Sequence, residues 1–154
     1  MFNVTNNITI NCPRFDVAEF SANPDTYSQW YGGIHQVEWK TSRPLIVGSK
    51  IGFITRMLGI PVPFLCEVLE YVPGYHLVLN ETGTSFTLQT ILTWEENAEG
   101  QTIVTLQNNG GFPTLPKPLA RLLEAIVGGA FLRASIHNLA ALKKAMERKE
   151  CKVN

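Results

Sequence analysis

Residues 85–109 read SFTLQTILTWEENAEGQTIVTLQNN, and this stretch decides the fold. Its first part, 85–95, alternates apolar and polar side chains, which is the period-two pattern of a half-buried strand. The segment NAEGQ at 97–101 predicts a turn, and a second strand follows over 102–109. Two strands joined by a short turn predict an antiparallel hairpin.

The same alternation identifies strands on the N-terminal side of this hairpin. It is clearest over 34–41, where His35, Val37 and Trp39 share one face, so we expect these three side chains to point toward the interior. The seven predicted strands are 2–10, 34–41, 50–57, 63–72, 76–81, 85–95 and 102–109. Because short turns join most of them, the sheet is predicted to be antiparallel.

Two short helices are predicted between the first two strands. Pro13 suits a first helical turn, and the helix that follows it is expected to end near Asn23. Asn23 can then cap a second helix, whose first turn is preset by Pro24 and which ends at Gly32-Gly33.

A long helix is predicted from Leu115 to about Arg148, with two apolar stripes that differ by about half a turn. The first stripe is Leu119, Leu122, Leu123, Ile126 and Ala130, and the second is Leu132, Leu139, Leu142 and Met146. Gly128-Gly129 lies where the first stripe ends and the second begins, and two glycines inside a helix destabilise it by about 2 kcal/mol relative to alanine.

Two arrangements of this helix account for the stripes. A kink or break at Gly128-Gly129 would turn both stripes toward the sheet, and this is the preferred expectation. Alternatively, the helix is straight and the first stripe covers a ligand entrance or a second subunit.

The order of elements predicts an α+β fold in which a strongly curved seven-stranded sheet wraps around the terminal helix. One helix is too narrow to fill such a sheet, so an apolar cavity is expected between them. The strands turn the following side chains toward it: Val37, Trp39, Phe53, Phe86, Leu88, Leu92 and Val104.

Composition limits the classes of function. The chain has 154 residues with 13 basic and 13 acidic side chains, and it lacks a dense basic run, so we expect no nucleic-acid partner. Apolar stretches are too short for stable membrane insertion, and no signal peptide is apparent, so we expect a cytoplasmic protein. Residues 1–154 are expected to form a single domain, with a disordered tail from about residue 149.

The three cysteines, Cys12, Cys66 and Cys151, are widely spaced and contain no Cys-x-x-Cys pair. An odd number at such spacing encodes neither a disulfide framework nor a zinc site, so reduced thiols are expected. The three histidines, His35, His76 and His137, are scattered, so no metal is expected. The chain also lacks phosphate-binding and nucleophile motifs, and we therefore expect no cofactor.

Several segments, in this order, resemble the START-like, birch-pollen-allergen-like superfamily (SRPBCC) and, within it, the polyketide cyclase/dehydrase group. They are the apolar first strand, Asp16-Val17-Ala18-Glu19-Phe20 through Asn23-Pro24 to Trp30, Ile34 to Val37, Val47-Gly48, Glu67-Val68-Leu69-Glu70 before Pro73-Gly74, Gly100-Gln101-Thr102-Ile103-Val104, and Asn138-Leu139-Ala140-Ala141-Leu142-Lys143. The resemblance implies the helix-grip fold and a pocket for lipids, polyketides or other hydrophobic molecules. It does not imply one activity, since members include enzymes, lipid carriers and receptors.

His35 and Glu70 are the candidate acid/base residues. His35 is predicted to face inward, and an imidazole exchanges protons near neutral pH, although a structural role is more common for such a residue. Glu67 and Glu70 are predicted to face opposite sides of their strand, and Glu70 lies inside if Val68 does. A carboxylate in an apolar cavity would anchor a ligand hydroxyl or move a proton, whereas a carboxylate at the rim would pair with a surface lysine.

Arg133 and His137 lie one turn apart and could clamp a carboxylate or enolate, but a surface position is favoured for both. The predicted ligand-binding residues are His35, Val37, Trp39, Phe53, Val68, Glu70, Phe86, Leu88, Leu92, Val104, Leu132 and Leu139.

Three functions remain open at this point. The first is binding of a hydrophobic small molecule, such as a lipid or polyketide, in the cavity. The second is a polyketide cyclase or dehydratase that uses an inward acid/base. The third is a protein-interaction module that docks through the stripe from Leu119 to Val127, and the chain is expected to be a monomer or a homodimer.

Overall fold

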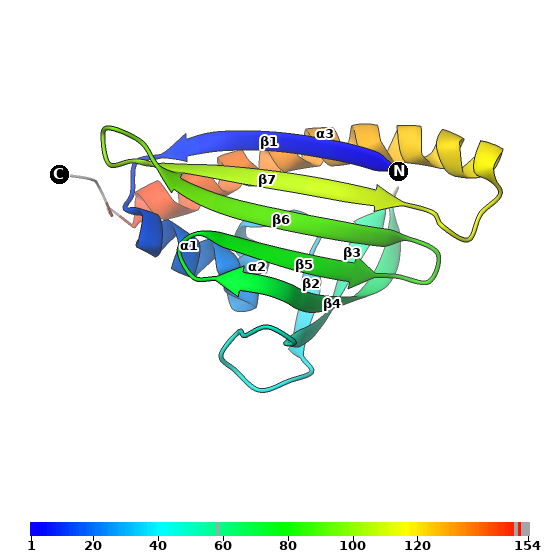
Figure 1. The fold of residues 1–154 in the computed structure, drawn as a ribbon, viewed down its shortest axis with the longest axis horizontal. Coiled ribbons are helices and arrows are strands. Elements are labelled where there is room, and N and C mark those ends of the chain that lie inside the picture. The colour runs from blue at the N-terminus through cyan, green and yellow to red at the C-terminus, as the bar shows by residue number, and fades with distance from the viewer. Residues whose placement is uncertain (58, 150, 152–154) are drawn as a thin grey trace.

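The computed structural model describes residues 1–57, 59–149 and 151, and their strands form one curved antiparallel sheet (Figure 1). The order across the sheet is β1-β7-β6-β5-β4-β3-β2, so the first strand in the sequence, β1, pairs with the last, β7. The strands are β1 (Phe2–Ile10), β2 (His35–Trp39), β3 (Lys50–Met57), β4 (Ile60–Val72), β5 (His76–Thr82), β6 (Thr87–Glu96) and β7 (Thr102–Gly111). The predicted seven-stranded antiparallel sheet is confirmed.

Four helical segments complete the fold: α1 (Arg14–Ala22), the 3-10 turn η1 (Pro24–Thr26), α2 (Tyr27–Trp30) and α3 (Lys117–Arg148). Asn23 caps η1 by accepting a hydrogen bond from the backbone N–H of Asp25 at 3.0 Å, as its sequence position predicts. Figure 1 shows α3 running alongside β1, with α1 and α2 near its C-terminal end. The predicted α+β helix-grip arrangement is confirmed.

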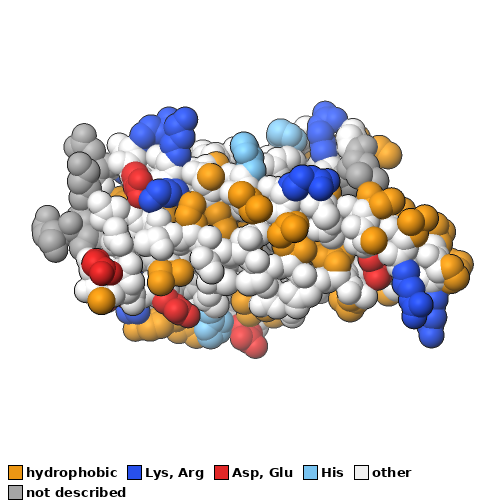
Figure 2. Space-filling view, turned by 90° about the horizontal axis from the view of Figure 1, so that it is seen from above, with side chains coloured by type: hydrophobic (Ala, Val, Ile, Leu, Met, Phe, Trp, Pro, Cys, Tyr) orange, Lys and Arg blue, Asp and Glu red, His pale blue; other side chains and the backbone are white. Residues whose placement is uncertain are grey.

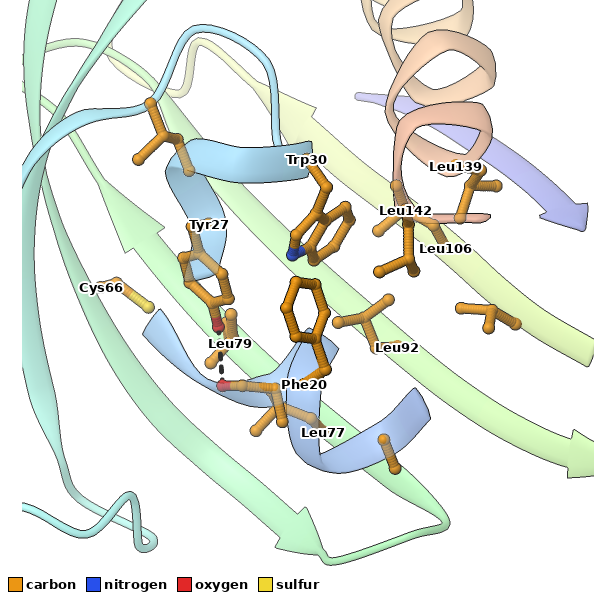
Figure 3. Packing of buried hydrophobic residues seen from close by; sticks show 14 of the residues in the cluster. Phe20, Tyr27, Trp30, Cys66, Leu77, Leu79, Leu92, Leu106, Leu139 and Leu142 are labelled. Carbon is orange, nitrogen blue, oxygen red and sulfur yellow. Dashed lines mark hydrogen bonds between the residues drawn. The ribbon is translucent and has the colours of Figure 1, made fainter. Parts of the chain in front are cut away.

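The main core lies where α1, α2 and the second half of α3 meet the sheet. Trp30 of α2 is 2% exposed and lies between Leu142 of α3 and the side chains of Phe20 and Tyr27 (Figure 3). The Tyr27 hydroxyl donates a hydrogen bond to the carbonyl of Ala22 at 3.3 Å, which satisfies its buried oxygen. Aromatic side chains of the two short helices therefore fill one end of the space under the sheet.

The terminal helix is continuous from Lys117 to Arg148, so it does not break at Gly128-Gly129. A Cβ added to Gly128 would lie 3.0 Å from the Cβ of Phe2, whereas one added to Gly129 would meet only the Arg133 guanidinium at 3.7 Å. Gly128 thus allows α3 to lie close against β1, and this contact offsets the helix-propensity cost of that glycine.

Much of the first apolar stripe faces solvent. Leu119, Leu122 and Ile126 are 45%, 59% and 46% exposed, while Val127 beside them is buried. Figure 2 shows hydrophobic side chains gathered at the end of the molecule where α3 begins. The preferred expectation, that a kink or break turns both stripes toward the sheet, is therefore wrong.

Cys12 and Cys151 form a disulfide, with their Cα atoms 5.1 Å apart, and Cys66 is a buried free thiol. The expectation of three reduced thiols is therefore wrong. Spacing could not reveal this pair, because the two cysteines are 139 residues apart and come together only when α3 packs beside the end of β1. The predicted tail from about residue 149 includes residues 150 and 152–154, which lie outside the described residues.

No helix among the described residues is long and apolar enough to cross a membrane. The cytoplasmic location stays a prediction.

Substitution of the two neighbouring glycines separates helix propensity from close packing. Gly129→Ala should raise the free energy of unfolding by about 0.5–1 kcal/mol, since the added methyl group makes only an ordinary van der Waals contact with the Arg133 side chain. Gly128→Ala should lose most or all of that gain, because its methyl group presses on Phe2. Urea unfolding of both variants measures the difference, and equal stabilisation by both would contradict the close approach.

Reduction of the disulfide should destabilise the fold. The bond closes a loop of 139 residues in sequence, and loss of a native cross-link of this kind costs roughly 2–4 kcal/mol. Dithiothreitol should therefore lower the melting temperature of the wild type. The variant Cys151→Ser should melt at the lower temperature with or without the reductant, and a wild type insensitive to reductant would contradict the pairing.

Candidate functional site

A cavity of about 120 Å³ lies between the middle of α3 and the concave face of the sheet. Its lining comes from the end of α2, the strands β3 to β7 and one face of α3. The lining residues are Tyr31, Gly32, Ile34, Phe53, Thr55, Arg56, Phe64, Glu81, Leu88, Asn108, Val127, Ala130, Phe131, Ala134, Ser135 and Asn138. Arg56 and Ala134 are also exposed, so the cavity reaches the surface between β3 and α3.

Aromatic rings form much of the apolar wall. Phe53 of β3 and Phe64 of β4 stack with ring centroids 5.9 Å apart and planes at 16°. Phe131 of α3 lines the opposite side, and its ring stacks at 6.1 Å on Phe86, which lies behind the wall. The aromatic lining favours an apolar ligand.

A buried polar chain crosses this apolar lining from β7 to β5. Asn108 donates from Nδ2 to the hydroxyl of Thr90 at 3.0 Å, and Thr90 donates to Oε2 of Glu81 at 2.9 Å. Asn108 also donates to the hydroxyl of Tyr31 at 3.4 Å. Regular alternation places these side chains inside, since Thr90 and Asn108 are directly paired across β6 and β7, and Glu81 follows the buried Leu79 by two residues on β5.

Burial controls the charge of Glu81. The side chain is 4% exposed, and loss of hydration raises the pKa of Glu81 to about 7, although the hydrogen bond from Thr90 lowers it. Burial also raises the pKa of Tyr31 and that of Cys66, the register partner of Glu81 on β4, so both stay neutral near pH 7. Glu81 is thus present in both protonation states near neutral pH, which suits hydrogen bonding or proton transfer.

Polar groups at the other end of the cavity position α3. The backbone N–H of Gly32 donates to Oδ1 of Asn138 at 2.9 Å, which ties the end of α2 to the helix. Ser135 accepts a hydrogen bond from Nδ2 of Asn6 on β1 and donates to the carbonyl of Leu132 at 3.0 Å. These side chains have protein partners, so their role in the described structure is to hold the walls together.

The expectation that His35 and Glu70 face the cavity is wrong. His35 is exposed, and Glu70 lies on the outer surface, where its Oε2 is 3.3 Å from Nε2 of His76. Both strands carry an irregularity beside the candidate: the register shifts between His35 and Glu38 in β2, and between Val68 and Glu70 in β4. A bulge inserts one extra residue and so reverses the face of the residues beyond it.

The other predicted ligand-binding residues fall into four groups. Phe53 and Leu88 line the cavity. Val37 and Trp39 are half-buried, and Leu132 is exposed, which contradicts its predicted inward position. Buried in the core, but not in the cavity lining, are Val68, Phe86, Leu92, Val104 and Leu139.

Arg133 and His137 are both exposed, as favoured from the sequence. Within the residues that the structure describes, no group of three or more histidine, cysteine or acidic side chains is arranged to hold a metal ion.

Glu81, the acidic residue of the cavity, was not among the sequence candidates. The signal for it was present, because Leu77, Leu79 and Glu81 alternate on one regular strand and so share a face. Thr90 and Asn108 follow from the same rule on β6 and β7. Tyr31 could not be placed this way, because its position depends on where α2 ends above the sheet.

A family model described as "Polyketide cyclase / dehydrase and lipid transport" matches residues 1–147. No curated protein matches the chain by sequence.

Solved structures with the same fold include the Zhui aromatase/cyclase from Streptomyces sp. R1128, with a TM-score of 0.78 at 16% identity over 96% of this chain and 94% of that one. TTHA0849 from Thermus thermophilus has a TM-score of 0.77 at 14% identity, over 93% and 95% of the two chains. The two-domain aromatase/cyclase BexL, from the BE-7585A biosynthetic pathway, has a TM-score of 0.71 at 14% identity; the match covers 96% of this chain and 47% of BexL.

The raised pKa of Glu81 predicts how stability depends on pH. The folded state holds a proton on Glu81 up to about pH 7, whereas an unfolded glutamate loses it near 4.5, so the stability contributed by this group falls as pH rises through that interval. The free energy of unfolding of Glu81→Gln, measured relative to wild type by urea unfolding, should therefore rise by about 2–3 kcal/mol between pH 5 and pH 8.

Glu70→Gln is the matched control, since Glu70 is exposed. Its free energy of unfolding relative to wild type should change little between pH 5 and pH 8. If the value for Glu81→Gln also does not depend on pH, Glu81 is not buried as described.

Proposed function

The chain belongs to the polyketide cyclase/dehydrase and lipid transport family, and we propose that it binds a hydrophobic small molecule in the cavity between α3 and the sheet. The observation that carries this proposal is the cavity itself, with aromatic side chains on opposite walls and an opening beside Arg56. Side chains that served only the fold would close this space, because protein interiors pack to crystal-like density.

The size of the cavity favours a compact ligand. About 120 Å³ is several times the space that one buried water molecule needs, and it lies below the roughly 300–1,000 Å³ of pockets for drug-sized ligands. A ligand of one or two rings fits this range, with any longer part extending through the opening at Arg56 and Ala134. Affinity would come mostly from burial of apolar surface, at about 25 cal/mol per Å² before the costs of association.

A cyclase or dehydratase reaction is the second candidate, and the position of Glu81 favours it. A carboxyl group with a pKa of about 7 can take and return a proton at neutral pH, beside a cavity that would hold the reacting carbons. On this proposal Glu81→Gln abolishes turnover of a short poly-β-ketone thioester while Glu70→Gln retains it. Full activity of both variants would exclude Glu81 as the acid/base.

Filling the cavity from α3 tests the binding function. Ala130 lines the cavity, so Ala130→Phe should occupy the space and remove the ligand that copurifies with the wild-type protein. Native mass spectrometry measures the bound mass directly. The expected loss is at least about tenfold in the occupied fraction, since a ring in the cavity competes with the ligand for the same volume.

Ala140→Phe provides the matched control on the same helix, because Ala140 is exposed and does not line the cavity. It should retain the ligand, and circular dichroism should confirm that both variants fold. A wild-type protein that carries no ligand and takes up no apolar probe would contradict the proposed function.

A further inference from the structure

We propose that Glu81 makes the cavity selective for compact apolar ligands that carry a hydrogen-bond donor, such as a phenolic or enolic hydroxyl, which it anchors in the buried wall. This inference rests on the proposed binding function and names the class of ligand for the same cavity. It follows from the direction of the hydrogen bonds, from the Oε1 atom of Glu81, to which no described residue donates a hydrogen bond, and from the lack, among described residues, of a second group near Glu81 that titrates near neutral pH.

The hydrogen bonds of the polar chain run in one direction. Thr90 has a single hydroxyl proton and donates it to Oε2 of Glu81, while its oxygen accepts a hydrogen bond from Nδ2 of Asn108. An amide nitrogen can only donate, so the direction is fixed from β7 to β5. The chain therefore ends on Glu81 as an acceptor, which is the arrangement that supports an ionised carboxylate.

The second oxygen of Glu81 is open to the cavity. No described residue donates a hydrogen bond to Oε1, and the fully enclosed side-chain atoms without a partner are, among described residues, Arg14 Nε and Trp30 Nε1. Oε1 of Glu81 is thus neither satisfied by the protein nor sealed within it. A ligand hydroxyl in the cavity would supply the missing donor, and a buried acceptor without one is costly.

Among described residues, no other group that titrates near neutral pH faces Glu81. Tyr27 and Tyr31 reach it from the α2 segment and Cys66 from β4, and burial raises the pKa of all three, so they remain neutral. Thr90 and Asn108, which connect to Glu81 from β6 and β7, do not titrate. The same holds for Ser135 and Asn138, the polar residues with which α3 lines the cavity, and β3 contributes Arg56, which is exposed at the rim. As pH rises, the ionisation of Glu81 should therefore be the change that strengthens binding of a ligand with a hydrogen-bond donor.

The aromatic wall restricts the rest of the ligand. Phe53, Phe64 and Phe131 give the cavity an apolar wall that would bury the rest of the ligand. A ring whose hydroxyl is replaced by a methoxy group buries as much apolar surface but leaves Oε1 of Glu81 unpaired. Sites built to bond a hydroxyl reject analogues that lack it far more strongly than sites that read only shape.

The test compares 2-naphthol with 2-methoxynaphthalene by calorimetry at pH 5.5 and pH 8. For the wild type at pH 8, 2-naphthol should bind at least about tenfold more tightly than the ether, which is the strength of a hydrogen bond to a charged group. At pH 5.5 Glu81 is protonated, and the preference should fall to about threefold or less. Glu81→Gln should show the lower preference at both pH values, and Glu70→Gln should behave as wild type.

The wild-type pH series does not depend on whether a variant folds. Equal affinity for the two probes at pH 8, or a preference that Glu81→Gln retains in full, would overturn the selectivity while leaving the binding function intact. If neither probe binds the wild type and no ligand copurifies with it, the binding function itself fails, and the selectivity fails with it.

Discussion

The close approach of α3 to β1 at Gly128 determines the rest of the structure. A single helix that touches one side of a curved sheet stands away from the other side, and α3 packs chiefly against β1, β7 and α2. At one end, the aromatic side chains of α2 fill the space that results (Figure 3). Asn138 fixes the end of α2 to the helix by accepting a hydrogen bond from the N–H of Gly32. The cavity is what remains beside them, under the middle of α3.

The polar chain in this cavity lowers the stability of the fold. Glu81 is buried beside neutral groups, and a carboxylate in such a place loses hydration that one hydrogen bond from Thr90 does not replace. A leucine at this position would continue the pattern of Leu77 and Leu79 without that cost. Departures from a locally favourable sequence of this kind concentrate at functional sites, which is why the position of Glu81 supports a role in ligand recognition.

Alternation along regular strands made the sheet predictable, since β5, β6 and β7 pair without a break and their inward residues follow from the sequence. The same rule failed at His35 and Glu70 because each lies beside a register shift, and single-sequence patterns do not show where an extra residue enters a strand. Gln36 has a φ of 52°, which marks the local distortion in β2. The Cys12–Cys151 bond and the position of Tyr31 depend on how helices pack over the sheet, and no local pattern encodes them.

The titratable residues that line the cavity favour ligand binding over catalysis. Among its described lining residues, Glu81 is the group that changes charge near neutral pH, while Tyr31 keeps its proton and Arg56 lies at the exposed rim. A reaction here would therefore need Glu81 both to take a proton and to return it, because no second acid or base of matched pKa stands across from it. Binding requires only that Oε1 accept one hydrogen bond while the rings of Phe53, Phe64 and Phe131 exclude water. The geometry meets that smaller requirement with the residues already in place.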